Sequence, residues 1–425
     1  MMSRLPNSSY YAASAGDFPR QGALIGDHQC DVCIIGGGFT GLSAALSCAE
    51  AGLNTILVEA ETISDGASGR NGGQLIPGLN MQGVDLIKML GSEHGEKLYR
   101  LAISARDRVH DRIDKHKIDC DLRHGHFHVA AKKSHFAHLE EECAFVTERL
   151  GPGVAEMVLP DEVHKYLGVK GYHGGIFIHI GGHFHPLKYA QGLARAAIKA
   201  GAKIFEGSRA LSVTASGDVT VQTANGVVKA RHAILACDSE LGEIESDLGR
   251  YAMPVLNYNI ATEQLDADRA RALIPSGAAV SDSRFVLNYF RVTPDNRLIF
   301  AGGEKYTPAP PPDISAFVRP HMLKLFPQLA DVAIEYAWGG AVGITINRLP
   351  HFGRRGNVLF AHGYSGQGAL LTTLEGELMA EAIQGRSERF DLFASIPHNP
   401  WPGGKLLRTP LYVAGMLHAA MMDRL

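Results

Sequence analysis

The chain has 425 residues, of which 45% are hydrophobic and 20% charged, and it carries a formal net charge of −3. This composition is ordinary for a globular protein with a large core, and the near-neutral charge does not favour nucleic acid as a partner. The first thirty residues lack the apolar run of a secretion signal, and no stretch of eighteen or more apolar residues predicts a spanning helix. We therefore expect a cytoplasmic protein, whose oligomeric state the sequence does not specify.

The N-terminal part of the chain predicts an arm followed by one βαβ unit. Residues 1–30 are rich in Gly, Pro and Ser. A buried strand is predicted at 31–35, then a glycine turn and a helix that runs to about Ala51. Gly52 suits the position after a helix C-terminus, and 53–59 returns as a strand. Both strands are continuously apolar, as is typical of parallel strands buried on two faces.

The middle and C-terminal parts mix helix and strand signals. Helices are predicted over 84–117, 134–150, 186–200, 314–326 and 368–384, from apolar residues at helical spacing. Strands are predicted over 121–130, 203–205, 211–215, 219–223, 230–236, 335–338 and 358–362, and residues 250–305 are rich in strand signals. The tail contains four prolines and then the apolar stretch 411–422.

This order of elements predicts an α/β fold, α+β overall, in which parts distant in the sequence form one nucleotide-binding domain. A mainly antiparallel sheet would be inserted from the middle of the chain. The expected division is an arm (1–30), a discontinuous FAD-binding domain (31–80, 180–245 and 335–390), a substrate domain (81–179 and 246–334) and a tail (391–425).

The strongest motif is GGGFTG at residues 36–41, between the first strand and the first helix. Gly36 allows a tight turn, Gly38 lets the backbone approach a pyrophosphate, and Gly41 permits close packing of helix and strand. The helix N-terminus favours phosphates. Glu59 ends the second strand, where a carboxylate accepts hydrogen bonds from ribose hydroxyls and repels a 2′-phosphate. The pattern predicts a dinucleotide site and disfavours NADP.

Two further glycine clusters favour FAD over NAD. Residues 66–74 (GASGRNGGQ) supply backbone N–H groups together with Ser, Arg and Asn side chains further along an extended cofactor. Residues 362–368 (HGYSGQG) precede a predicted helix, whose N-terminus can neutralise the negative charge of a reduced flavin. Each cluster alone is equally compatible with an ordinary glycine loop, but the three together indicate a flavin site.

At these three clusters the sequence resembles the D-amino-acid-oxidase-like flavoenzymes, which include glycine oxidase and sarcosine oxidase. Residues 9–16 (SYYAASAG), 66–74, 346–353 (INRLPHFG) and 363–368 are most similar to members that oxidise γ-glutamylated diamines. The resemblance covers about residues 8–395. It implies a flavoprotein that oxidises the C–N bond of a small amine to an imine and aldehyde, with O₂ reduced to H₂O₂.

The resemblance also implies how FAD is bound. Some relatives attach it through a cysteine in the C-terminal third, but this chain has no cysteine after Cys237, so non-covalent FAD is expected. Gln367 stands where a histidine is expected. The implied FAD-binding residues are Gly36, Gly38, Phe39, Thr40, Gly41, Glu59, Ala60, Ser68, Arg70, Asn71, Gly72, Gly73, Gln74, Ala210, Ala236, Gly340, Gly363, Tyr364, Gly366, Gln367 and Gly368.

Three residues are candidates for the chemistry. Tyr289 and Arg291 are two apart in a predicted strand and so share a face. Arg291 could bind a substrate carboxylate while Tyr289 covers the flavin, or it could be a solvated arginine paired with Glu304 or Asp295. His362 could supply positive charge for dioxygen reduction, or be a buried histidine with its hydrogen bonds satisfied.

The chain contains 20 histidines, which raises a metal-binding hypothesis. His124, His126 and His128 alternate along a predicted strand, and a looser group follows at 179–185. Metal sites need ligands that converge on one centre, which adjacent strand positions rarely provide. We therefore expect no metal site.

Alternative functions remain open from the residues alone. The same fold serves oxidases of glycine, sarcosine or D-amino acids. It also serves dehydrogenases that pass electrons to a quinone or carrier protein, a contact that the apolar residues 411–422 could make. A flavin-binding protein without turnover is a third alternative, which the complete set of three clusters disfavours.

Overall fold

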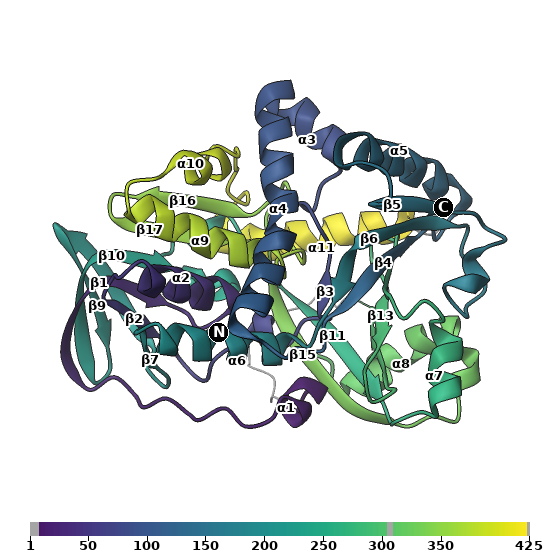
Figure 1. The fold of residues 1–425 in the computed structure, drawn as a ribbon, viewed down its shortest axis with the longest axis horizontal. Coiled ribbons are helices and arrows are strands. Elements are labelled where there is room, and N and C mark those ends of the chain that lie inside the picture. Colours follow the sequence, from purple (N-terminus) through teal and green to yellow (C-terminus); the bar gives the residue numbers. More distant parts are fainter. Residues whose placement is uncertain (1–7, 304–308, 423–425) are drawn as a thin grey trace.

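The computed structural model describes residues 8–303 and 309–422. These residues form two β-sheets with surrounding helices (Figure 1). Sheet A, on the left of Figure 1, contains the two strands of the predicted βαβ unit. Sheet B, on the right, is formed by strands that lie between residues 74 and 344. The predicted fold class, an α/β nucleotide-binding part with a mainly antiparallel second sheet, is confirmed.

Sheet A has the strand order β16-β17-β10-β1-β2-β7, with β9 and β8 extending from β10. Strand β1 pairs in parallel with both β10 and β2, so three sequence-distant segments end at the same edge of the sheet. The strands are β1 (Gly26–Ile35), β2 (Thr55–Val58), β7 (Lys203–Phe205), β8 (Ala210–Ser216), β9 (Asp218–Thr223), β10 (Gly226–Leu235), β16 (His351–Arg355) and β17 (Val358–His362).

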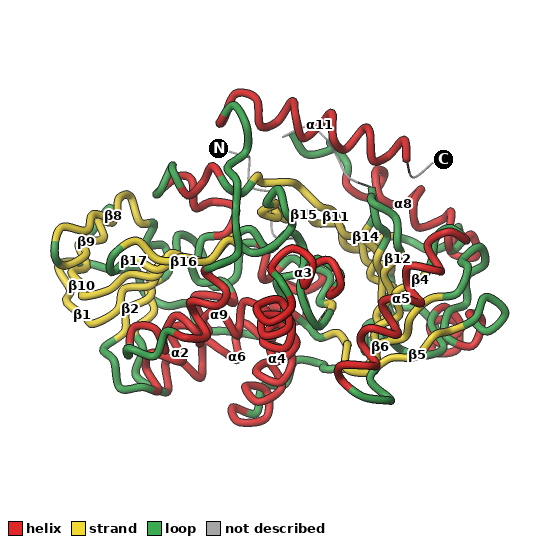
Figure 2. Tube along the Cα trace, turned by 90° about the horizontal axis from the view of Figure 1, so that it is seen from above, coloured by secondary structure: helices red, strands yellow, loops and turns green. Residues whose placement is uncertain are grey.

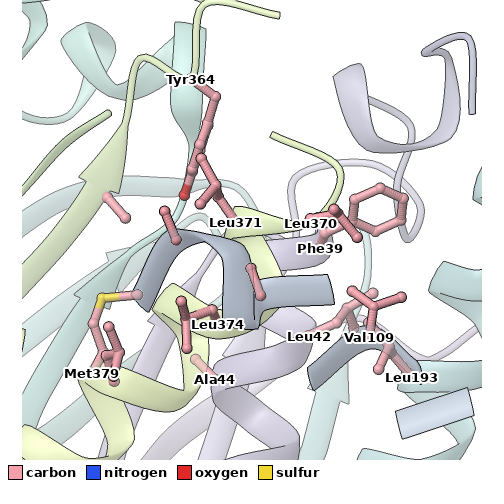
Figure 3. Packing of buried hydrophobic residues seen from close by; sticks show 14 of the residues in the cluster. Phe39, Leu42, Ala44, Val109, Leu193, Tyr364, Leu370, Leu371, Leu374 and Met379 are labelled. Carbon is pink, nitrogen blue, oxygen red and sulfur yellow. The ribbon is translucent and has the colours of Figure 1, made fainter. Parts of the chain in front are cut away.

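A layer of helices covers one face of sheet A because their apolar sides pack on its buried strands. Helix α2 contacts both α6 and α9, and α4 contacts α9. Phe39, Leu42, Leu193 and Leu374 meet in this core (Figure 3). The helices are α2 (Phe39–Glu50), α4 (Ser92–His116), α6 (Pro186–Lys199) and α9 (Leu371–Ile383), and α10 (Glu388–Ala394) follows beside β16.

Sheet B has the order β15-β11-β14-β13-β12-β4-β6-β3, with β5 beside β6. All its pairs are antiparallel except β12 with β4, which is parallel. The strands are β3 (Gln74–Leu75), β4 (Arg123–Val129), β5 (Ala155–Val158), β6 (Gly175–His183), β11 (Met253–Thr262), β12 (Ala279–Asp282), β13 (Tyr289–Val292), β14 (Leu298–Ala301) and β15 (Ile334–Ile344).

The two faces of sheet B have different neighbours. Its outer face is covered by α8 (Ile314–Leu325) and α7 (Ala267–Leu273), which bury Tyr258, Phe290 and Phe300. Its inner face, the opposite one, carries the alternate residues of β11, β13 and β15 and looks toward the loop that follows β2. Helices α3 (Gly83–Leu90) and α5 (Lys133–Leu150) pack on each other beside α4.

One helix near each end of the chain lies against the inner face of sheet B. Helix α1 (Tyr10–Ser14) packs at one end, and α11 (Gly404–Met422) crosses above β11 and β15 (Figure 2). Within residues 8–303 and 309–422, no helix is both long and apolar enough to cross a membrane.

The elements differ from the sequence prediction at several places. The predicted arm (1–30) contains α1 and the first residues of β1. The predicted helix 84–117 is two helices that are separated at Gly91, whose φ is +84°. Strands β5, β6 and β16 and helices α7 and α10 were not predicted as such.

Two predicted domain boundaries cross elements of sheet B. The third predicted FAD-binding segment starts at residue 335, within strand β15. This strand pairs along its length with β11 of sheet B. Strand β6 likewise spans the predicted boundary at 180, and β3 pairs with it. In the structure these strands belong to sheet B, and the division into domains stays a prediction.

Candidate functional site

The turn between β1 and α2 is built so that only glycine fits at two positions. Gly36 has φ +107°, and a Cβ atom there would lie 2.6 Å from the carbonyl oxygen of Ala236. A Cβ atom at Gly41 would overlap the carbonyl oxygen of Gly36. Ala236 is held in place because its N–H donates to the carbonyl of Ile35 at 2.9 Å. The turn therefore closes tightly against β10, with α2 starting directly above it.

The N-terminus of α2 meets residues from β2 and from the loop that follows it. Gly38 is the N-cap and has no side chain to cap the helix, so its end is open to an anion. The N–H of Phe39 donates to Ser68 Oγ at 3.0 Å. Glu59 ends β2 beside the turn, where its Oε2 accepts a hydrogen bond from the Gly37 N–H at 2.7 Å. The N-terminus of α2 and the Glu59 carboxylate thus lie side by side.

The loop 66–74 is held by its own side chains. Arg70 is buried; its Nε donates to the Asp65 carbonyl at 2.6 Å and its Nη1 to the Gly339 carbonyl at 3.2 Å. The Asn71 side chain donates to the Ala67 carbonyl and accepts from the Gly73 N–H at 2.8 Å. These two side chains therefore shape the loop from within.

Sheet B anchors the same loop from the other side. The Trp338 indole N–H on β15 donates to the Arg70 carbonyl at 2.9 Å, and Gln74 Nε2 donates to the Val280 carbonyl at 2.8 Å. A Cβ atom at Gly340 would lie 3.3 Å from Arg70 Cβ. The loop is thus clamped between the end of sheet A and the inner face of sheet B.

Arg291 shares the inner face of sheet B with Tyr289, and it is buried there rather than solvated. It is 2% exposed, and its Nε donates to the Gly72 carbonyl at 2.9 Å. Its Nη2 donates to the Phe184 carbonyl and to the Tyr11 hydroxyl, each at 3.2 Å. It is therefore not a solvated arginine paired with Asp295; Asp295 binds Arg297 and Tyr10 instead, and Glu304 lies outside the described residues. The guanidinium binds protein carbonyls and supports the glycine loop.

Tyr289 lies on the same inner face, as predicted from its spacing. Its hydroxyl donates to Asn257 Oδ1 at 2.6 Å, and a Cβ atom at Gly72 would overlap its ring. Gly72 therefore allows the Tyr289 ring to approach the loop backbone. The structure brings Tyr289, Arg291 and the second glycine cluster together.

The third glycine cluster is tied to the first cluster and to the chain that follows the second. The Tyr364 hydroxyl is 2.8 Å from Thr40 Oγ1 on α2, and Asn80 Nδ2 donates to the Ser365 carbonyl at 2.7 Å. The Gly363 N–H donates to Asp238 Oδ1 at 2.8 Å. All three clusters therefore converge at the carboxyl ends of β1, β10 and β17, where open α/β sheets bind ligands.

Two acidic residues of this region were missed from the sequence. Asp238 also accepts from the Gly343 N–H at 3.2 Å, so it links β15 to the third cluster. Glu375 on α9 is fully buried, and burial raises its pKa to about 8. An acidic residue at a helical position among apolar neighbours is the only signal in the sequence for Glu375. For Asp238, which follows a strand, no local pattern exists.

His362 does not meet Tyr289 or Arg291. It is fully buried, and its Nε2 lies 2.9 Å from Nδ1 of His351 on the neighbouring strand β16. Burial lowers the pKa of His362 to about 3. The imidazole is therefore neutral, so the positive charge expected for dioxygen reduction is disfavoured here. Its Nδ1 has no hydrogen-bond partner among the described residues, so it is not a fully satisfied histidine either.

The remaining predicted cofactor residues lie around these clusters. Ala60 follows Glu59, and the Ser208 N–H binds the Glu59 carbonyl at 2.7 Å just before Ala210 begins β8. Gly366 has φ +91°, which suits the turn before α9. Gln367 donates its N–H to the Tyr364 carbonyl, and the Gly368 carbonyl accepts from Thr372 Oγ1 at 2.8 Å.

Two of the three alternating histidines share one hydrogen-bonding partner. His126 Nε2 and His128 Nδ1 lie 3.0 and 2.9 Å from the same hydroxyl, Ser281 Oγ. His183 Nε2 lies 3.1 Å from the Gly277 carbonyl. Among residues 8–303 and 309–422, no group of three or more His, Cys, Asp or Glu side chains is arranged to hold a metal ion.

These features fit the ADP part and the pyrophosphate of FAD. The open α2 N-terminus and Gly38 offer donors to phosphate, and Glu59 offers acceptors to ribose hydroxyls. Loop 66–74 connects this end of sheet A with the inner face of sheet B. The chain belongs to the FAD dependent oxidoreductase family, whose sequence profile matches residues 31–382.

Within this family, the chain is similar to several individual proteins. The chain is 40% identical to gamma-glutamylputrescine oxidoreductase of Escherichia coli (strain K12), over 98% of each chain. It is 37% identical to the probable oxidoreductase OrdL of Rhizobium meliloti (strain 1021), over 99% of this chain and 98% of that protein. In fold it is similar to the glycine oxidase of Geobacillus kaustophilus, with a TM-score of 0.72 and 21% identity over 88% of this chain and 100% of that one.

Proposed function

We propose that the protein is an FAD-dependent amine oxidase that acts on a γ-glutamylated diamine. The observation that carries this proposal is the near full-length similarity to gamma-glutamylputrescine oxidoreductase. In the proposed reaction R–CH₂–NH₂, O₂ and H₂O give R–CHO, NH₃ and H₂O₂. The C–N bond is oxidised to an imine, which water hydrolyses to the aldehyde.

FAD, when bound, would supply the two-electron redox chemistry, with O₂ as the final acceptor. The residues of the chain would supply binding and orientation. Gly36, Gly38 and the α2 N-terminus would hold the pyrophosphate, and Glu59 would hold the ribose. Loop 66–74 connects this site with sheet B.

The substrate site we propose lies between that loop and the inner face of sheet B. Tyr289 covers the loop at Gly72, and its hydrogen bond to Asn257 keeps the ring in one orientation. A held aromatic ring at this position orients the amine and excludes water from the reacting carbon. Arg291 acts as a positioning residue, because its Nε donates to the Gly72 carbonyl, beside which the Tyr289 ring lies.

An anaerobic titration tests the function directly. γ-Glutamylputrescine added to the yellow holoprotein should bleach the flavin absorbance, and admitted air should restore it with release of H₂O₂. Bleaching by glycine, sarcosine or a D-amino acid alone would keep the chemistry and contradict the substrate. Bleaching that air does not reverse would instead indicate a dehydrogenase that uses a quinone or a carrier protein.

A further inference from the structure

The inner face of sheet B continues beyond the position proposed for the amine. Asn257 on β11 lies opposite Gly340 on β15, and two positions along the same face Val255 lies opposite Val342. Residues two apart on a strand are separated by about 7 Å. A substrate whose reacting carbon lies near Tyr289 and Asn257 can therefore extend along this face in one of two directions.

One of these directions is closed. At the α1 end, the inner face is filled by Tyr11 and Trp338, both fully buried, and by the guanidinium of Arg291. The rings of Tyr11 and Trp338 pack edge to face with centroids 5.3 Å apart. This end has no room for a chain of methylene groups.

The other direction ends under helix α11. Tyr412 of α11 packs down onto the sheet, with 9% of its surface exposed, whereas Leu417 on the same helix is 55% exposed. Figure 2 shows α11 crossing above β11 and β15 at this end. The apolar surface around Tyr412 is formed by Met253, Val255, Val286, Val342, Ile344 and Trp401.

The tail, which carries Tyr412, lies beyond the part of the chain that the family profile matches. The family profile ends at residue 382, before α10 and α11. The glycine oxidase of similar fold is covered completely by 88% of this chain, whereas the gamma-glutamylputrescine oxidoreductase matches 98% of it. A relative whose printed name gives a longer substrate thus matches nearly the whole chain, including the tail.

We propose that Tyr412 of α11, together with Val255 and Val342, forms the wall of the substrate site that binds the methylene chain of the diamine. This inference rests on the proposed function. The apolar wall suits methylene groups, since each one removed from water contributes about 0.8 kcal/mol. Tyr412 is thereby a specificity-determining residue that favours long amines over short ones.

A pair of substrates and a pair of variants test this role. We would compare γ-glutamylputrescine with the γ-glutamyl derivative of 1,2-diaminoethane, which is two methylene groups shorter, by steady-state oxidation with the holoenzyme. Tyr412→Ala should raise KM for the longer substrate about tenfold and leave kcat unchanged, because two methylene groups lose their apolar contact. KM for the shorter substrate should change less than twofold. Leu417→Ala, on the exposed side of the same helix, should change neither.

Each other outcome decides the question. Equal losses for both substrates, no effect of Tyr412→Ala, or the same effect from Leu417→Ala would overturn the proposed role. Flavin content and the thermal unfolding midpoint show whether Tyr412→Ala has folded. If it has not, Val342→Ala tests the same wall from β15, with the same two substrates. A wild-type flavin that neither substrate reduces would overturn the proposed function itself, and this is seen before any variant is made.

Discussion

Arg291 shows how a residue chosen for ligand binding can have a different role in the fold. Its three hydrogen bonds go to Gly72, Phe184 and Tyr11, which come from the loop after β2, the segment after β6 and helix α1. A buried cation with such partners holds segments together, and a lysine could not reproduce its planar, forked geometry. The residue therefore supports the surface on which FAD is expected to lie.

Replacement of Arg291 by Met should destabilise the protein and weaken cofactor binding. The carbonyls of Gly72 and Phe184 would stay buried without donors, so we expect the free energy of unfolding to fall by about 2–4 kcal/mol. Flavin content after purification should fall as well. Denaturant unfolding and the flavin absorbance measure both effects.

The matched control is Arg354→Met, which breaks an exposed ion pair with Asp391 and should cost less than about 1 kcal/mol. If Arg291→Met kept its stability and its flavin but raised KM, the arginine would bind the substrate carboxylate after all.

At the scale of elements, the β1–α2 turn connects tight packing with cofactor binding. Helix α2 can start above β1 only because Gly41 lets it approach the carbonyl of Gly36. The position of the helix N-terminus, and with it the donors for phosphate, depends on this contact.

Gly41→Ala should move α2 away from the turn. We expect a loss of about 1–3 kcal/mol in the free energy of unfolding, as is usual for overpacking, and a marked decrease in bound FAD. Gly415→Ala is the helical control, because a Cβ atom there meets no atom within 4 Å. Unchanged flavin binding in Gly41→Ala would show that the turn does not set the phosphate site.

The sequence predicts local elements well where the signal is local. Strand β1, helix α2 and the helices α6 and α9 follow from apolar spacing and glycine stops within short windows. Strand β6 was missed because its glycines and histidines hide the alternation, and α7 is only seven residues long. The partners of Arg291 are more than a hundred positions away in the sequence, so no local pattern could reveal them. The three glycine clusters were found because each has a motif of its own.

For the molecule as a whole, buried histidines set the response to acid. Burial lowers the pKa of His351 to about 2, of His362 to about 3 and of His398 to about 4, and the pKa values of His126 and His183 to about 3. In the unfolded chain these groups titrate near 6.5. Below that pH the unfolded state takes up protons that the folded state does not, so stability is lost as the pH falls.

The histidines should therefore make the thermal unfolding midpoint decrease from pH 6.5 to pH 4.5, whereas Glu375, whose pKa burial raises to about 8, acts in the opposite direction between pH 4.5 and pH 8. His362→Gln removes one such group and should make the decrease shallower, whereas His164→Gln, at an exposed position, should leave it unchanged. An unaltered slope in His362→Gln would mean that His362 is protonated in the folded protein. The hypothesis that His362 supplies positive charge for dioxygen reduction requires such protonation.

The way sheet A is assembled has a consequence for the synthesis of the protein. Its parallel strands come from residues 26–58, 203–235 and 358–362, and β10 lies between β1 and β17. The glycine turn leaves the ribosome long before Ala236, against which it packs, and before Tyr364, which contacts Thr40. Contacts of such long sequence separation form late in folding. Loading with FAD therefore follows translation of nearly the whole chain, and a product that terminates before β17 would stay without cofactor and be exposed to degradation.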